Sequence, residues 1–150
     1  MQSTLKTEVK IEGIGLHSGA TVNLALAPAP VDHGIVFIRS DISGVDNVIP
    51  ALWDRVVDTR LCTVIGNDAG ISVGTIEHLM AALRGCGIDN VKVILDGPEV
   101  PVMDGSSAPF IEMIDSAGIT LQDTPRRVIK VLKEITVREG DKFVTLAPSD

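Results

Sequence analysis

The residues best suited to chemistry are an adjacent glutamate and histidine, Glu77 and His78. A neutral imidazole is a good zinc ligand, and a carboxylate beside it can act as a base toward water. The zinc motif His-Glu-x-x-His is not present, because position 82 is an alanine. The segment therefore offers one metal ligand and not two.

The surroundings of His78 on its own helix favour an approach by another group. Apolar residues recur at helical spacing over residues 76–83 and predict an amphipathic helix. At about 100° per residue, His78 lies opposite this apolar stripe, flanked by Ala81, Ala82 and Gly85. A core histidine would lie on the apolar side, and a plain surface helix would surround it with charged residues. An interface histidine and a catalytic histidine both remain open.

A glycine-rich segment precedes this helix and also carries a histidine. Gly13, Gly15 and Gly19 permit a tight loop around His17, with positive φ and close backbone approach. No helix start follows the loop, which excludes the dinucleotide-binding and P-loop motifs. A simple turn between strands and a loop that lines a pocket both remain open.

Two further segments carry polar residues at the ends of predicted elements. Asp104 lies in a strand-to-helix connection, where it can accept hydrogen bonds from the following amides or join Ser106 in capping the helix. The segment 58–63, Asp-Thr-Arg-Leu-Cys-Thr, opens a strand. Its cysteine, Cys62, is by default a small buried hydrophobe.

The periodicity of the chain predicts how these segments are positioned. Period-two alternation with glycine-rich turns predicts strands, and i, i+3, i+4 spacing predicts helices. We expect an α+β fold, a two-layer sandwich of a mostly antiparallel sheet of about five strands, covered on one face by two helices. The predicted strands include 5–11, 22–26, 35–39, 60–65, 71–73 and 91–95, and the helices are 76–85, capped by Thr75 or Ser72, and 107–117.

The end of the chain differs from the rest. Residues 121–125 read as a linker, and short strands are predicted at 128–132, 135–138 and 142–146, with a hairpin turn at 139–141. No predicted helix covers these strands. We therefore expect one domain over residues 1–125, and a linker with the first strands of an incomplete second domain over 126–150.

Composition excludes several classes of partner and compartment. The net charge is −7, and no basic cluster exceeds Arg126-Arg127, so we expect no nucleic-acid partner. Two cysteines, Cys62 and Cys86, without a paired motif fit a reducing compartment. The first residues are too polar for a signal peptide, and no apolar run approaches about 18 residues. We expect a cytoplasmic protein without a transmembrane segment.

Taken in order, the segments resemble a known family. The chain is similar to the UDP-3-O-acyl-N-acetylglucosamine deacetylases, which are zinc amidases of lipid A biosynthesis, and the resemblance covers nearly all of it. The matching segments are Gly-Ile-Gly-Leu-His-Ser-Gly at 13–19, Asp-Thr-Arg-Leu-Cys-Thr at 58–63, Thr-Ile-Glu-His-Leu-Met-Ala-Ala-Leu at 75–83, Gly-Ile-Asp-Asn-Val at 87–91 and Pro-Val-Met-Asp-Gly-Ser-Ser-Ala-Pro-Phe at 101–110.

The resemblance implies a role for each of the residues above. His78 would be a ligand of Zn²⁺ and Glu77 the general base, with zinc polarising the N-acetyl carbonyl of UDP-3-O-acyl-N-acetylglucosamine. His17, Leu61 and Cys62 would line the substrate pocket. The residues expected to support the site structurally are Gly13, Gly15, Gly19 and Asp104.

The resemblance also implies that part of the site lies outside this chain. The family's other two zinc ligands come from a His-x-x-x-Asp motif, which with the general-acid histidine belongs to a C-terminal domain. Residues 1–150 contain no such motif. We therefore expect a fragment of the deacetylase that neither holds zinc tightly nor deacetylates alone. The alternative is a non-catalytic binding or assembly module that retains the scaffold.

Overall fold

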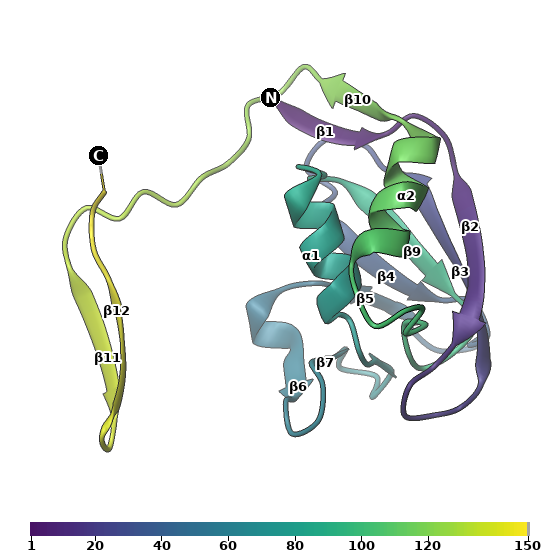
Figure 1. Cartoon of the computed structure of the whole chain (residues 1–150), viewed down its shortest axis with the longest axis horizontal. Helices are drawn as coiled ribbons and strands as arrows, with labels where there is room; N and C mark the ends of the chain where they lie inside the picture. Colours follow the sequence, from purple (N-terminus) through teal and green to yellow (C-terminus); the bar gives the residue numbers. More distant parts are fainter. Residues whose placement is uncertain (150) are drawn as a thin grey trace.

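The computed structural model describes residues 1–149 and contains a five-stranded sheet with two helices on one face (Figure 1). The sheet order is β2-β3-β9-β4-β5, and all neighbours are antiparallel except β4 and β9, which are parallel. The predicted α+β fold with a mostly antiparallel sheet is therefore confirmed. The sheet strands are β2 (Val9–Ile14), β3 (Thr21–Pro28), β4 (Ile35–Arg39), β5 (Val48–Pro50) and β9 (Val91–Leu95), and the helices are α1 (Glu77–Gly85) and α2 (Ala108–Ala117).

The buried core lies between this sheet and the two helices. Alternate residues of β3 and β9 are fully buried, as expected for strands with one face on a core. Phe37 of β4 and Phe110 of α2 are the largest fully buried side chains. The core is otherwise aliphatic, so its stability rests on many small apolar contacts.

Helix α1 is buried over a wider arc than its apolar stripe predicts. Ile76, Leu79 and Leu83 are buried as expected, but Ala82 is buried as well. Its predicted place on the outer face beside His78 is therefore wrong, because α2 packs against α1 and widens the covered face. Ala81 and Gly85 are exposed, as predicted.

The C-terminus of α1 ends in a glycine motif. The amide of Gly87 donates to Arg84, and that of Ile88 donates to Leu83, which is the Schellman pattern. Gly87 has a φ of +73°, whereas the helical Gly85 has no neighbour within 4 Å of the position of a β-carbon. Of these two glycines, Gly87 needs the conformational freedom of glycine and Gly85 does not.

Gly87→Ala is expected to lower the free energy of unfolding by about 1–2 kcal/mol, because an L side chain is strained at this φ. Gly85→Ala is the matched control and should raise it by up to about 1 kcal/mol, since alanine is the better helix former. Urea unfolding of this chain measures both. An equal loss in the two variants would contradict the assignment.

Two smaller sheets flank the main one. β6 (Val56–Asp58), β7 (Val64–Gly66) and β8 (Ser72–Val73) form an antiparallel sheet next to a short 3₁₀ helix, Trp53–Arg55. The strand predicted over 60–65 was thus too long, because only its end pairs. A turn at 67–70 joins β7 to β8.

The other flanking sheet brings the N-terminus beside a later segment. β1 (Gln2–Leu5) pairs with β10 (Ile119–Gln122), so residues 121 and 122 belong to a strand and not to the predicted linker. The sequence signal was missed because β10 is short and has no buried face. Beyond it, Arg126 forms an ion pair with Asp89, with 2.6 Å between Nε and Oδ1.

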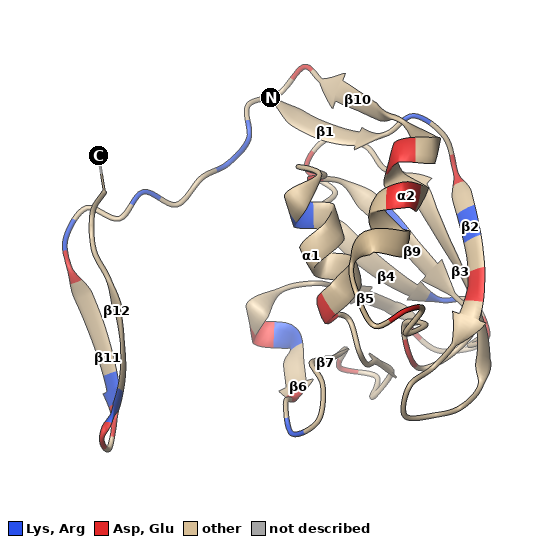
Figure 2. Cartoon of the chain, viewed as in Figure 1, with Lys and Arg blue, Asp and Glu red and all other residues tan. Residues whose placement is uncertain are grey.

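The last described residues form a hairpin apart from the core. β11 (Ile135–Glu139) and β12 (Lys142–Leu146) pair antiparallel, which confirms the predicted hairpin, while the strand expected at 128–132 does not form. Every residue of both strands is exposed, and Figure 1 shows the hairpin to one side of the helices. Charged residues lie both on the hairpin and on the part that contains the helices and the main sheet (Figure 2).

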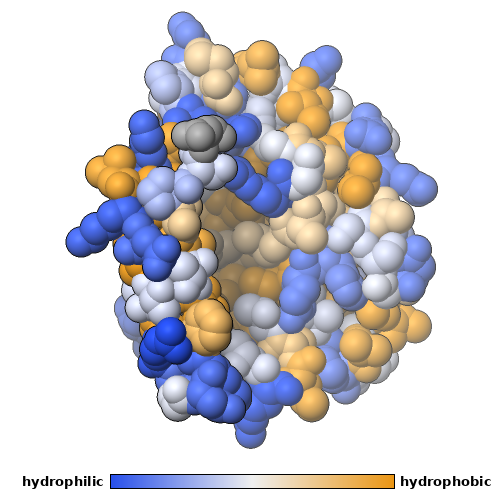
Figure 3. Space-filling view, turned by 60° about the vertical axis from the view of Figure 1, so that its left-hand side comes forward, coloured by the Kyte–Doolittle hydropathy of each residue, from blue (hydrophilic) through white to orange (hydrophobic). Residues whose placement is uncertain are grey.

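Exposed apolar side chains are concentrated near this end of the chain and near β6. Trp53 is 89% exposed and Ile129 is 96% exposed. Viewed from the side of the hairpin, the surface has a broad depression with hydrophobic residues in and around it (Figure 3). Large exposed apolar areas commonly mark an interaction surface.

No helix within residues 1–149 is long and apolar enough to cross a membrane.

Candidate active site

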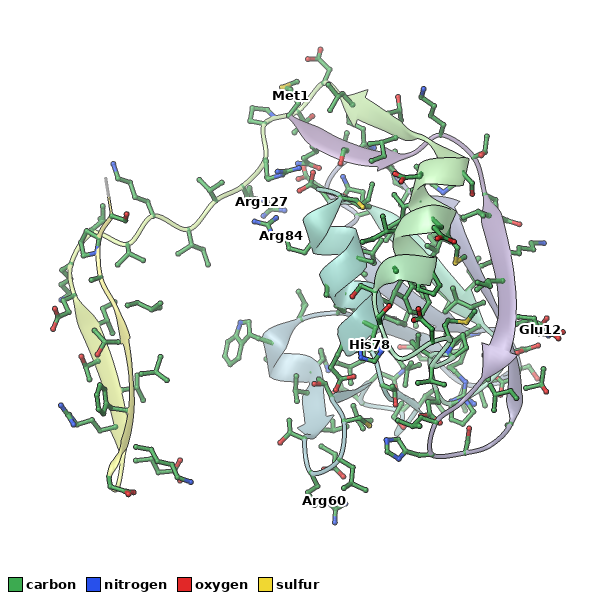
Figure 4. All side chains as sticks on the ribbon, in the orientation of Figure 1. Met1, Glu12, Arg60, His78, Arg84 and Arg127 are labelled. Atoms are coloured by element: carbon green, nitrogen blue, oxygen red, sulfur yellow. The ribbon has the colours of Figure 1, made fainter. Side chains whose placement is uncertain are left out.

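The first turn of α1 carries Glu77 and His78. Figure 4 shows His78 at the end of α1 toward the loop of Arg60, with Arg84 at the opposite end. Both Glu77 and His78 are half-buried. The backbone amide of Thr63 donates to Oε1 of Glu77, so this carboxylate is oriented by a residue of another element.

The electrostatic environment keeps Glu77 ionised. Burial raises the pKa of this carboxyl group, but the hydrogen bond from the Thr63 amide and the charge of His78 lower it, and the net pKa lies below its usual range. An ionised carboxylate at neutral pH is the form that can accept a proton. The geometry therefore allows Glu77 to act as a base.

Asp104 is a second carboxylate close to His78. Its Oδ1 accepts hydrogen bonds from the hydroxyl and the amide of Ser106, at 2.8 and 2.9 Å. These bonds lower the pKa of Asp104, with a further contribution from the charge of His78. The bonds within this connection bear out the Asx-type geometry predicted for Asp104, and Ser106 Oγ in turn accepts from the Ala108 amide at the start of α2.

A hollow of about 720 Å³ opens beside this helix start. His17, Leu61 and Cys62 lie together on its wall, although they come from segments more than 40 residues apart. Neither Glu77 nor His78 lines it, but Thr75 does, and Thr63, which holds Glu77, follows Cys62 directly. The structure therefore brings the three residues expected in a substrate pocket to one place, while their role in binding stays a prediction.

Glycines of the loop 13–19 permit its close packing. A β-carbon at Gly13 would lie 2.8 Å from atoms of Met103 and Pro101, and one at Gly15 would lie 2.6 Å from Oε2 of Glu99. Gly19 has a φ of +64° and bonds to Gly15 through its amide. The loop thus packs tightly along the segment that leads to α2.

The half-buried Asp58 pairs with the exposed Arg60 on the rim of the hollow. The distance between Asp58 Oδ2 and Arg60 Nη2 is 2.6 Å, and the Arg60 amide also bonds to Asp58. Hydrogen bonds from Arg60 hold the pKa of Asp58 well below its usual range. The apolar Leu61 follows Arg60 on this rim, and its side chain is 84% exposed.

The residue expected to cap α1 has another role. α1 begins without a side-chain cap, so the capping prediction for Thr75 or Ser72 is wrong. Thr75 has a φ of +56°, and its hydroxyl donates to Glu99 Oε1 at 2.7 Å. A threonine at positive φ cannot place its hydroxyl as a normal N-cap does.

Glu99 is the main residue of this region that sequence reasoning missed. It is 4% exposed, and its carboxylate accepts hydrogen bonds from the amides of His17 and Ser18 as well as from Thr75. Burial raises the pKa of Glu99, but these bonds outweigh it and the net pKa is lowered. The available signal was a single acid in the rigid stretch Pro-Glu-Val-Pro at 98–101.

The described residues can supply part of a metal site. No group of three or more His, Cys, Asp and Glu residues within 1–149 could hold a metal ion, and a catalytic zinc takes about three protein ligands. The His78 imidazole fits one of these ligands, since carboxylates lie near it. A zinc site that used His78 would need further ligands from outside these residues.

Comparison with known proteins decides the family. The family model described as UDP-3-O-acyl N-acetylglycosamine deacetylase matches residues 2–150. The chain belongs to this deacetylase family. Proteins named UDP-3-O-acyl-N-acetylglucosamine deacetylase are 53% identical over 148 residues in Myxococcus xanthus, 48% over 149 in Phenylobacterium zucineum and 47% over 147 in Shewanella baltica.

The deacetylase family match covers the chain but not the relatives. These three alignments include 98–99% of this chain, but only 46%, 51% and 48% of the respective relatives. The chain therefore spans about half the length of the curated relatives it matches, and corresponds to their N-terminal part. This agrees with a deacetylase that continues into a second domain.

Proposed function

We propose that this chain is the N-terminal half of a zinc-dependent deacetylase that removes the acetyl group of UDP-3-O-acyl-N-acetylglucosamine in lipid A biosynthesis. The observation that carries the proposal is the placement of Glu77 beside His78, with its carboxylate held by the Thr63 amide next to the hollow. The substrate is taken from the names of the relatives.

The chemistry assigned to this chain is proton transfer. Zinc, when bound with His78 as one ligand, would polarise the amide carbonyl and acidify water. Glu77 takes a proton from the attacking water as the water oxygen bonds to the carbonyl carbon. The carbon–nitrogen bond then breaks, acetate is released, and the sugar nitrogen takes a proton from an acid that we place in the rest of the polypeptide.

We also propose that residues 126–150 begin the second domain. Exposed apolar residues on β11, on β12 and around Trp53 support this, because they are typical of a surface that another part of the protein covers. The active site would then lie between the domains, with His17, Leu61 and Cys62 on one wall.

Two free cysteines support a reducing compartment, and we propose the cytoplasm.

Removing the metal is the direct test. In the full-length polypeptide that carries this chain, a chelator should abolish the release of acetate, and Zn²⁺ should restore it. The 150-residue chain alone should bind zinc more weakly than about 1 μM, because a catalytic site needs about three protein ligands. Calorimetric titration measures the second result, and sub-micromolar binding would contradict it. Acetate release that a chelator leaves intact would refute zinc dependence.

A further inference from the structure

Glu99 is a buried carboxylate placed between two segments that border the same hollow. It lies in the connection after β9, where residues 74 and 99 form an isolated parallel bridge. The amide of Gly74 donates to Pro98, and that of Val100 donates to Gly74. The backbone around Glu99 is therefore fixed to the segment that leads directly into α1.

The side chain of Glu99 extends this connection to the loop of His17. Its Oε1 lies 3.0 Å from the His17 amide nitrogen, and its Oε2 lies 3.0 Å from the amide nitrogen of Ser18. The same Oε1 accepts the Thr75 hydroxyl. A buried carboxylate is stable only when it is hydrogen-bonded, and these donors come from two different segments.

Each of the two segments has a feature that depends on this carboxylate. Thr75 is a β-branched residue at a φ of +56°, a conformation that persists only where the surroundings hold it. Gly15 leaves the space that the Glu99 carboxylate occupies, because a β-carbon there would meet its Oε2 at 2.6 Å. The side chains of His17 and Ser18 are exposed, and their amides donate to Glu99, whereas the amides of Gly15 and Gly19 bond within the loop itself.

We propose that Glu99 is a positioning residue, which holds the loop of His17 and the strained Thr75 in one geometry beside Glu77. Thr75 lies two residues before Glu77, so the carboxylate connects the wall of the hollow to the start of the helix that carries the base. The inference rests on the proposed function. Glu99 acts through the two segments and does not touch the reacting atoms.

The test uses Glu99→Gln in the full-length polypeptide, with Glu12→Gln as the matched control. Glu12 is exposed on β2, and its replacement should change nothing. Glu99→Gln should lower kcat/KM about 10- to 100-fold, because small misplacements of a site carry losses of this size. Zinc content should stay unchanged. If kcat/KM per folded molecule equals that of the wild type, the positioning role is overturned.

A second readout is independent of deacetylation. Hydrogen exchange of the full-length protein, followed by mass spectrometry, should show faster exchange in peptides that cover residues 15–19 of Glu99→Gln, and unchanged exchange in β9. Unchanged exchange at 15–19 would overturn the proposal even if activity falls. Because exchange needs no substrate, a failure of the proposed function is distinguishable from a failure of this inference.

Thr75→Val provides the variant for the case in which Glu99→Gln does not fold. It replaces the hydroxyl that donates to Glu99 with a methyl group and keeps the shape of the side chain. We expect Thr75→Val to lower kcat/KM relative to the wild type, with Thr75→Ser close to the wild type. Equal activity of Thr75→Val and Thr75→Ser would overturn the connection between Thr75 and the carboxylate.

Discussion

Glu77→Gln in the full-length polypeptide is expected to lower kcat about 10²- to 10⁴-fold, the usual contribution of a general base. Glutamine keeps the length of the side chain and an oxygen that can accept the Thr63 amide, so the helix start should stay in place. It cannot accept a proton from water at neutral pH. Steady-state measurement of acetate release gives the result.

His78→Ala is the comparison that separates the two roles. It should remove bound zinc, whereas Glu77→Gln should leave the zinc content at the wild-type level, since only His78 is proposed as a ligand. Elemental analysis of the purified variants measures this. Wild-type kcat in Glu77→Gln would remove Glu77 from the role of base, and equal zinc loss in both variants would make it a ligand instead.

Phe110→Ala is expected to lower the free energy of unfolding of this chain by about 3–5 kcal/mol. Phe110 of α2 is fully buried between the helices and the sheet. Its removal leaves a cavity in a core that has few other aromatic residues. Such a loss is a large part of the roughly 5–15 kcal/mol that holds a domain folded. Urea unfolding measures it.

Phe143→Ala is the matched control on the same chain. Phe143 lies on β12, is 61% exposed, and has the guanidinium of Arg138 at 4.8 Å from its ring centre. An exposed contact of this kind contributes about 0.5–1 kcal/mol. A loss as large as that of Phe110→Ala would show that the hairpin is part of the same cooperative core.

The elements that were predicted well carry a strong periodic signal. In residues 91–95 every second residue is apolar, and in residues 76–85 apolar residues recur at helical spacing. Each element therefore has one apolar face, which can be buried without desolvating polar side chains. The short strands β5, β6 and β10 have no such signal, because each is only three or four residues long, and β10 in addition pairs with the distant strand β1. Ala82 was misplaced for a related reason, since its burial depends on where α2 packs.

For the site, the sequence by itself determined which groups are available. It placed Glu77 and His78 side by side at a helix start, away from the apolar stripe, and supplied glycines where the backbone must approach closely. These properties follow from local geometry, because helical spacing and the missing β-carbon of glycine act within a few residues.

Only the tertiary structure decided how these groups are held. The amide of Thr63 bonds to Glu77 across 14 positions, and Glu99 bonds to the loop of His17 across more than 80. Every non-proline residue has a backbone amide, so the residue types alone do not show which amide will bond to a given carboxylate. The hollow is also a product of tertiary structure, since its lining residues come from segments that are far apart in the sequence.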